Sequence, residues 1–319
     1  MGILKFIIRR LLFGVFTLVV IAFSVFSLSQ LLTSDPAQVF LGRDARPESL
    51  AAKREEFGLN KPKLQQFWDW FNQLFFHFNP GKSFSGEDIW GFMKDRIVNS
   101  MFLMLVCSLV CIPIAIFIGA MAARKRDGAF DNTTSFASLA LAAVPEFVIG
   151  VLLIVLLSTN VWHQFPATVR IRPGEQPWDH PDSLILPVLT LTLAVVPYVS
   201  RTMRASTIEV LESDYIEMAR LKGLSESTVL WRHAVPNAIG PTLQVIALNV
   251  AYLVTGVITI EVLFNYKGIS GALLDAVHAH NMPLVQFIAV FVAAIYVLVN
   301  LLADVGTILV TPRLRTSMK

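Results

Sequence analysis

The sequence predicts an all-α integral membrane protein with six transmembrane helices. Of its 319 residues, 55% are hydrophobic and only 15% are charged, whereas soluble domains carry about a quarter charged residues. The chain also contains six apolar runs close to the roughly 20 residues that a helix needs to cross a bilayer. A soluble core of this chain length could not bury six such helices. The runs cover approximately residues 11–33, 97–123, 134–158, 184–203, 239–263 and 285–310.

The first run follows Lys5, Arg9 and Arg10, as the apolar part of a signal peptide would. It is longer than the roughly 7–15 apolar residues of a signal peptide, and no small-x-small cleavage site precedes the polar residues TSDP. We therefore expect a retained first helix.

Small residues mark the second run. Cys107 and Cys111 lie four residues apart inside it, which favours small apolar fillers over a metal or disulfide role. Ala115, Gly119 and Ala123 follow as a small-xxx-small stripe, which predicts close packing against another helix.

Glu146 in the third run and Asp304 in the last are charged residues within predicted spans, and Asn300 lies four residues before Asp304. An unpaired charge in lipid is costly, so each is a candidate functional site. Pairing within the helix bundle is the favoured interpretation, and a gating or pathway-lining role stays open.

Basic residues predict the orientation, because short cytoplasmic loops carry an excess of Lys and Arg. The basic clusters share one side of the predicted topology, which places both termini in the cytoplasm and residues 34–96 and 159–183 outside. These clusters are Lys5–Arg10, Arg124–Arg126, Arg201–Arg232 and Arg313–Lys319.

A charged stretch, SDYIEMARLKGLSESTVLWRHAVPNA, separates the fourth and fifth runs. Asp214 as N-cap with Glu217 three residues later resembles a capping box, and Gly223 supplies a left-handed helix stop. The stretch therefore predicts a two-turn helix over Tyr215–Lys222. Ser225 can cap a second short helix, which Pro236 is expected to break or kink before the fifth span.

The two-turn helix is either a connector or a docking element for a partner. Tyr215, Met218, Ala219 and Lys222 fall on one helix face. Exposed Tyr215, Met218, Arg220 and Lys222 suit a protein interface, where aromatic, Met and Arg side chains are enriched.

Motifs of catalysis are incomplete. A P-loop requires G-x-x-x-x-G-K-[ST], and Gly81-Lys82-Ser83 has Phe76 at the first position. His278 and His280 are two residues apart and point to different helix faces. We expect no catalytic, cofactor-binding or metal-binding residue in this chain, and no enzymatic activity.

The charged stretch resembles the cytoplasmic signature of the membrane permease subunits of ABC importers. Glu217-Met218-Ala219, Gly223 and, after nine residues, His233-Ala234-Val235-Pro236 stand at that family's spacing. DYIEMARLKGLS and WRHAVPNAIGP look like the dipeptide and oligopeptide branch. The chain departs from that branch at Thr33-Ser34, Lys267 and Asn281.

The resemblance implies a type I ABC importer permease fold in the bacterial inner (plasma) membrane. It implies peptide transport and four kinds of partner besides the lipid bilayer: a second homologous permease, two ATP-binding subunits that hold ATP and Mg, and an extracytoplasmic binding protein. Nucleic acid is not an expected partner. The implied coupling residues are Asp214, Tyr215, Glu217, Met218, Ala219, Lys222, Gly223, His233 and Pro236.

Three domains are expected. Residues 1–93 contain the first helix and an outer segment, and residues 94–304 form a transmembrane core with its coupling loop at 204–238. Residues 305–319 form the end of the last helix and the tail. Within the outer segment, residues 53–78 predict an amphipathic helix with Trp68 and Trp70 near the membrane interface. Two roles stay open for the outer segment: it could cap the translocation pathway, or it could provide the surface on which the binding protein docks.

The cargo also stays open. Glutathione, a nickel chelate or a sugar-containing solute are alternatives to peptides. An ion-driven secondary transporter is a less favoured alternative. Such a transporter is expected to have paired discontinuous helices and charges at the membrane midplane, whereas this sequence shows one cytoplasmic docking loop and no clear midplane charge. A membrane scaffold would not account for the signature spacing.

Overall fold

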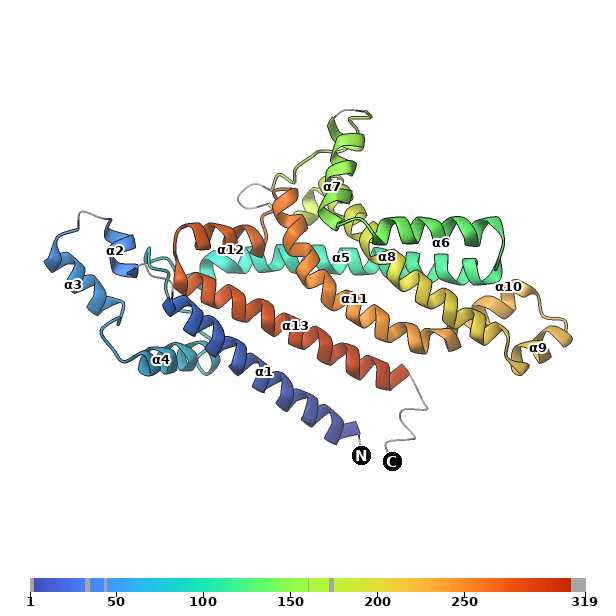
Figure 1. Ribbon diagram of the computed structural model, residues 1–319, viewed down its shortest axis with the longest axis horizontal. Coiled ribbons are helices and arrows are strands. Elements are labelled where there is room, and N and C mark those ends of the chain that lie inside the picture. Colours follow the sequence, from blue (N-terminus) through green and yellow to red (C-terminus); the bar gives the residue numbers. More distant parts are fainter. Residues whose placement is uncertain (1–2, 32–34, 43–44, 160, 172–174, 311–319) are drawn as a thin grey trace. The chain divides into compact units, whose positions relative to one another are not determined.

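The structure is a computed structural model that describes residues 3–31, 35–42, 45–159, 161–171 and 175–310 (Figure 1). Thr33, Ser34 and the C-terminal basic residues Arg313, Arg315 and Lys319 lie outside the described residues. The described part is helical throughout, apart from turns and one isolated bridge between Lys82 and Asp88.

The elements are, in chain order, α1 (Ile3–Leu31), α2 (Pro36–Leu41), α3 (Pro47–Glu56), α4 (Lys63–Phe75), α5 (Ile89–Arg124), α6 (Ala129–Ala142), α7 (Glu146–Ile154), the π-helix η1 (Val155–Thr159), the 3-10 helix η2 (Pro177–Asp179), α8 (Pro181–Leu211), α9 (Asp214–Leu221), α10 (Glu226–Thr228), the π-helix η3 (Val229–Ala234), α11 (Val235–Leu263), α12 (Ile269–His278) and α13 (Met282–Val310).

Five helical segments are long and apolar enough to cross a membrane. They are Lys5–Leu31, Ile89–Arg124, Pro181–Leu211, Glu226–Leu263 and Met282–Gly306. The third expected run is divided: α6 and α7 are bent by 103° at a short break. Pro145 explains the break, since it lacks an N–H and disfavours helical geometry at Val144. All-helical architecture with apolar spans is thus confirmed.

The chain forms two compact units, the first built mainly from Met101–Tyr266 and the second from Leu11–Ser100 and Lys267–Val297. In the first unit α8 is central and contacts α6, α7 and α11. Its apolar core includes Leu186, Leu191, Val195 and Val199 of α8, Leu253, Val257 and Ile260 of α11, and Leu103, Cys107 and Cys111 of α5. Both cysteines are fully buried there, as expected for small apolar fillers.

The small-residue stripe of α5 packs directly on α8. A Cβ placed on Gly119 would lie 2.5 Å from the carbonyl oxygen of Ser200 and 2.7 Å from the Cβ of Met203. Ala115 and Ala123 flank this contact and are buried. Small residues permit such an approach of two backbones, so the predicted close packing is confirmed.

The amphipathic helix predicted over residues 53–78 is divided in the second unit: α3 ends at Glu56, a turn follows, and α4 covers Lys63–Phe75. Phe67, Trp70 and Phe71 lie with Ala22 and Phe26 of α1 in an aromatic cluster, whereas Trp68 is 59% exposed. Because one face packs and the other stays open, the amphipathic interpretation is confirmed for this helix. Gly81-Lys82-Ser83 lies between α4 and α5, where Lys82 forms the isolated bridge with Asp88 and the Ser83 amide donates to the Glu87 carbonyl.

We expect Gly119→Ala to destabilise the protein. Alanine normally favours a helix over glycine by about 1 kcal/mol, but here its methyl group would overlap backbone atoms, and overpacking typically costs about 1–3 kcal/mol. Gly306→Ala in α13 is the matched control, because nothing lies within 4 Å of a Cβ at that position. Thermal unfolding of the purified variants in detergent tests this. Equal midpoints for the two variants would contradict the close contact.

Candidate coupling site

The charged stretch forms a helical hairpin, and its first helix, α9, begins one residue earlier than the sequence pattern indicates. Ser213 is the N-cap residue, and its hydroxyl donates to the carbonyl of Val210 rather than capping the helix. The predicted capping box between Asp214 and Glu217 is therefore wrong. Both carboxylates lie in the first turn instead, where they interact favourably with the helix dipole.

The predicted helix stop at Gly223 is confirmed. Gly223 has φ +80°, a conformation that is accessible to glycine at little cost. The amide of Gly223 donates to the Arg220 carbonyl at 2.9 Å, and that of Leu224 to the Ala219 carbonyl at 3.4 Å. This pair of bonds is a Schellman motif, which ends α9 and turns the chain sharply.

The second helix of the hairpin starts at Ser225, whose hydroxyl accepts from the Thr228 amide at 3.4 Å, as predicted. The break predicted at Pro236 is wrong, because the helix continues through this residue. Pro236 lies in the first turn of α11, directly after the π-helix η3. The wider π turn leads into α11 without an interruption, and Asn237 donates its side-chain amide to the His233 carbonyl at 2.7 Å.

A buried side chain fixes α9 to the spans. Ile216 is 0% exposed and points away from the charged face of α9. Its apolar cluster joins residues of α5, α8, η3 and α11, namely Ala120, Met203, Val229, Leu230, Ala234, Val235 and Ala238. Burying an isoleucine side chain contributes about 1.5–3 kcal/mol. An eight-residue helix is marginal alone in water, so this packing holds it.

Polar contacts close the hairpin at its rim. Arg220 pairs with Glu226 at 3.0 Å, and the Tyr215 hydroxyl donates to the His233 carbonyl at 3.4 Å. Both are exposed, so each contributes at most about 1 kcal/mol. Their geometry ties α9 to the second helix, which makes the hairpin one structural piece.

The outer face of α9 is solvent-exposed and combines three apolar or aromatic side chains with charged ones around them. Tyr215 is 46% exposed, Met218 55% and Leu221 75%, and Asp214, Glu217 and Lys222 surround them. The expected exposure of Tyr215, Met218, Arg220 and Lys222 is confirmed. Ala219 is the exception on the predicted face, since it is half-buried beside Ile216. We call Asp214, Tyr215, Glu217, Met218, Leu221 and Lys222 the outer face of α9.

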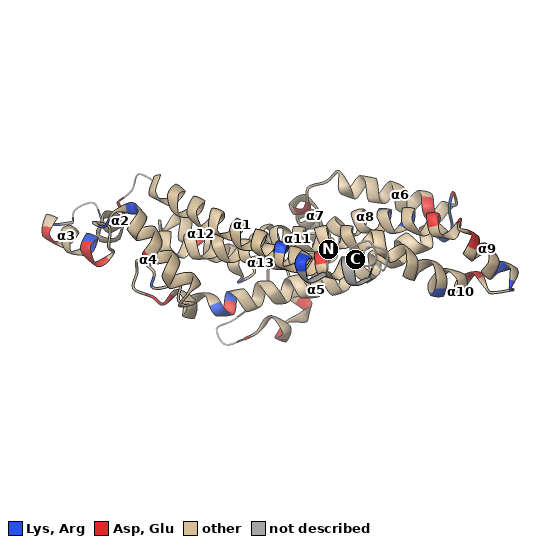
Figure 2. Ribbon diagram, turned by 90° about the horizontal axis from the view of Figure 1, so that it is seen from below, with Lys and Arg blue, Asp and Glu red and all other residues tan. Residues whose placement is uncertain are grey.

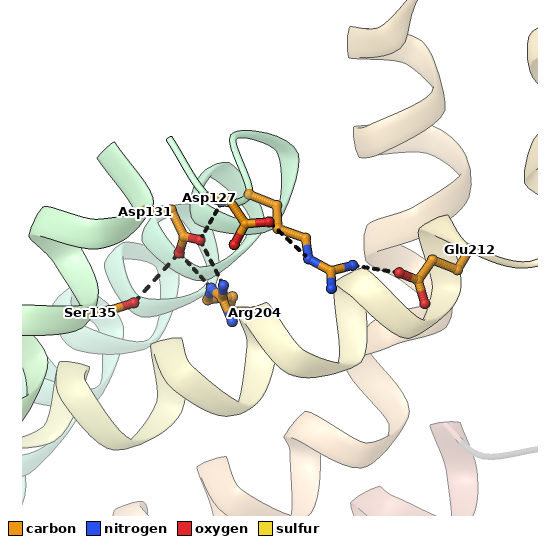
Figure 3. A network of polar contacts seen from close by, with 6 residues as sticks. Asp127, Asp131, Ser135, Arg204 and Glu212 are labelled. Atoms are coloured by element: carbon orange, nitrogen blue, oxygen red, sulfur yellow. Dashed lines mark hydrogen bonds and ion pairs between the residues drawn. The ribbon is translucent and has the colours of Figure 1, made fainter. Parts of the chain in front are cut away.

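In the ribbon coloured by residue type, many charged residues of this unit lie around α9, α10 and the turn from α5 to α6 (Figure 2). Two ion pairs belong to this end. Arg126 of the turn contacts Glu212 at 2.5 Å, beside the start of α9. Asp131 of α6 pairs with Arg204 of α8 through two bonds of 2.5 and 2.6 Å (Figure 3).

The Asp131 carboxylate is 2% exposed and also accepts from the Asp127 amide at 2.9 Å. It therefore ties the turn between α5 and α6 to α8. Sequence reasoning missed this pair because its partners lie 73 residues apart. An acidic residue in the first turn of α6, three residues after Gly128, was the available signal.

The candidate polar residues in the spans have different surroundings. Asp304 pairs with Arg10 of α1 at 2.9 Å, which confirms pairing within the bundle. Glu146 lies at the break between α6 and α7 and accepts a hydrogen bond from the Tyr252 hydroxyl of α11. Asn300 is half-buried on α13, four residues before Asp304.

Comparison with known protein families agrees with a helical membrane protein that carries a charged hairpin between two spans. Residues 115–316 match the family "binding-protein-dependent transport system inner membrane component", and residues 3–88 match the N-terminal region of such membrane components. The two matches together cover most of the chain, including the hairpin.

Relatives match over nearly the full length. A probable peptide ABC transporter permease protein of Sinorhizobium fredii is 33% identical, with 97% of this chain and 99% of the relative covered. The dipeptide transport system permease protein of Lactococcus lactis is 30% identical, with 98% and 99% covered. A glutathione transport system permease protein of Salmonella typhi is 29% identical with the same coverage. Family matches and relatives together place this chain among the permease subunits of ABC importers: it belongs to the inner membrane components of binding-protein-dependent transport systems.

Proposed function

We propose that this chain forms half of a translocation pathway for peptides, and that the outer face of α9 couples it to ATP hydrolysis in a partner. The observation that carries the proposal is a short helix with an exposed apolar face held rigidly on the spans by buried Ile216. An exposed apolar patch rimmed by charges is typical of a protein interface. A rigid hairpin transmits a push to the spans, whereas a flexible loop would absorb it.

Peptides are the proposed cargo. The relatives of Sinorhizobium fredii and Lactococcus lactis are described as peptide and dipeptide permeases. Glutathione, itself a small peptide, is the second candidate, supported by the Salmonella relatives. An extracytoplasmic binding protein would deliver the cargo.

The assembly would contain a second homologous permease and two ATP-binding subunits. The chain itself is then a non-catalytic subunit, and ATP and Mg are bound by the partners. Its incomplete P-loop motif supports this division of labour, because Phe76 replaces the first glycine and Gly81-Lys82-Ser83 lies at an isolated β-bridge rather than at the start of a helix.

The proposed topology has six spans, with the bent pair α6 and α7 counted as one, and both termini in the cytoplasm. Its support is the cluster Arg124–Arg126 at the end of α5, together with the basic residues around α9. In this topology the hairpin is cytoplasmic and residues 34–96 lie outside.

Thiol labelling checks the orientation. A cysteine at Lys125 is expected to react with a membrane-impermeant thiol reagent only from the cytoplasm, and one at Glu175 only from outside. The unmodified chain is the control, because Cys107 and Cys111 are fully buried and should stay unlabelled. Reversed labelling at either site would contradict the proposed topology.

ATP turnover checks the division of labour. The chain purified alone is expected to hydrolyse no ATP, and co-purification from its native membrane should recover ATPase subunits and a second permease. Hydrolysis by a preparation free of contaminating ATPases would show that the proposed assembly is wrong.

Gly223 variants check the coupling role. A β-branched residue at φ +80° is strained by about 1–2 kcal/mol, so Gly223→Val should distort the end of α9 and strongly reduce ATPase association and uptake. Gly223→Ala should be milder, and Gly223→Asn milder still, because asparagine tolerates this conformation. No neighbouring atom lies within 4 Å of a Cβ here, so protein levels should stay near normal.

The three variants separate backbone strain from side-chain bulk. Uptake and ATPase association are measured for each in membranes with equal protein levels. Normal transport by Gly223→Val with the ATPase still bound would mean that α9 is a passive connector.

A further inference from the structure

A cavity of about 380 Å³ opens at the break between α6 and α7. This size lies within the range of about 300–1,000 Å³ that is typical of small-molecule sites. Its polar groups are the Glu146 carboxylate and the hydroxyl groups of Tyr198, Tyr252 and Thr259. Among the described residues that line it, Glu146 is the charged one and no cation faces it.

Glu146 is not neutralised by its neighbours. The hydrogen bonds that its carboxylate accepts come from the hydroxyl groups of Tyr252 and Thr259, and both groups are neutral. Tyr252 lies well inside α11, far from either end. A carboxylate at such a depth is costly against lipid and is usually directed toward a bundle interior or a water-filled path.

The break itself favours a cation. The last turn of α6 supplies Leu141–Ala143 to the cavity wall, and the carboxyl end of a helix carries partial negative charge. Interrupted backbone at membrane depth is tolerated where it lines a cavity. The carboxylate, the helix end and the hydroxyl groups together form an acceptor-rich site.

The cavity continues a polar stripe on α11. Gln244, Tyr252, Thr255 and Thr259 lie on one side of α11 and are exposed or half-buried, with the exposed Leu248 between Gln244 and Tyr252. By contrast, α1 exposes apolar side chains such as Leu12, Phe13 and Phe16, as a lipid-facing helix does. The amide and hydroxyl groups of the stripe can hydrogen-bond to water or to a polar solute.

We propose that Glu146, with the Tyr252 hydroxyl, binds a primary ammonium group of the cargo as it passes along this stripe. This inference rests on the proposed peptide transport and assigns the group to the free amino terminus of the peptide. Glu146 accepts the charge-assisted hydrogen bond, and Tyr252 positions the carboxylate.

Uptake by the complete transporter tests the assignment. The assembled importer in proteoliposomes, with its binding protein and ATPase subunits, is given three peptides: a lysine-free tripeptide, its N-acetylated form, and an N-acetylated tripeptide containing lysine. Each is supplied at a concentration that saturates the binding protein, so that differences in uptake arise in the permease. The variants are Glu146→Gln and Tyr252→Phe, with Asp304→Asn as an acid-to-amide control at the Arg10 ion pair.

The wild type should take up the free-amino tripeptide faster than both acetylated peptides. Glu146→Gln should reduce this preference by about tenfold or more, the scale of a lost charged hydrogen bond. Tyr252→Phe should reduce it less, and Asp304→Asn should leave it unchanged.

Other outcomes overturn the proposal. If Glu146→Gln keeps the wild-type preference, the carboxylate does not bind the cargo. If the lysine-containing acetylated peptide is taken up as well as the free-amino peptide, the amino terminus is not the recognised group. If Glu146→Gln fails to assemble with the second permease, Glu146 is a subunit contact. If the wild type takes up none of the peptides, the proposed peptide cargo is wrong, and this site falls with it.

Discussion

The close approach of α5 to α8 at Gly119 is the contact on which the coupling end of the protein depends. Gly119 faces Ser200, Met203 and Arg204 of α8. Met203 also belongs to the apolar cluster that holds Ile216 of α9, and Arg204 pairs with buried Asp131 of α6. A side chain at residue 119 would separate two backbones and disturb α6, α8 and α9 together. The hairpin is therefore positioned by helix packing, and its exposed ion pairs only refine it.

The bilayer as a solvent explains why the same unit contains both an unbroken and a broken span. Within lipid every backbone group must find an internal partner, so α8 and α11 continue through prolines at residues 187, 197 and 241. The span formed by α6 and α7 breaks only beside a cavity that offers polar groups. A discontinuous helix is also a feature of secondary transporters, but here it occurs in a chain whose family is shown to be that of ABC importers.

Features with local causes could be predicted from the sequence. Apolar length predicted the spans, and Gly223 and Ser225 marked a helix stop and a helix start because their effects act within a few residues. The N-cap was misplaced by one residue because Ser213 and Asp214 are both good caps, and only the structure shows the Ser213 hydroxyl turned back to Val210. The pair Asp131–Arg204 and the inward side of Ile216 depend on helix packing, which one sequence does not reveal. The break at Pro236 was wrongly predicted because Pro236 lies in the first turn of α11, where its missing N–H is tolerated.

The continuity of α10, η3 and α11 has a mechanical consequence. Glu226–Leu263 is one helical segment of 38 residues, which at about 1.5 Å per residue makes a rod about 57 Å long. A rod of this length amplifies rotation: a tilt of about 10° around its Glu226 end would displace the Leu263 end by about 10 Å. The cavity residue Tyr252 lies along this rod, whereas Glu146 lies on a separate helix. A small angular movement at the hairpin would thus change the separation of the two groups without any local rearrangement of either.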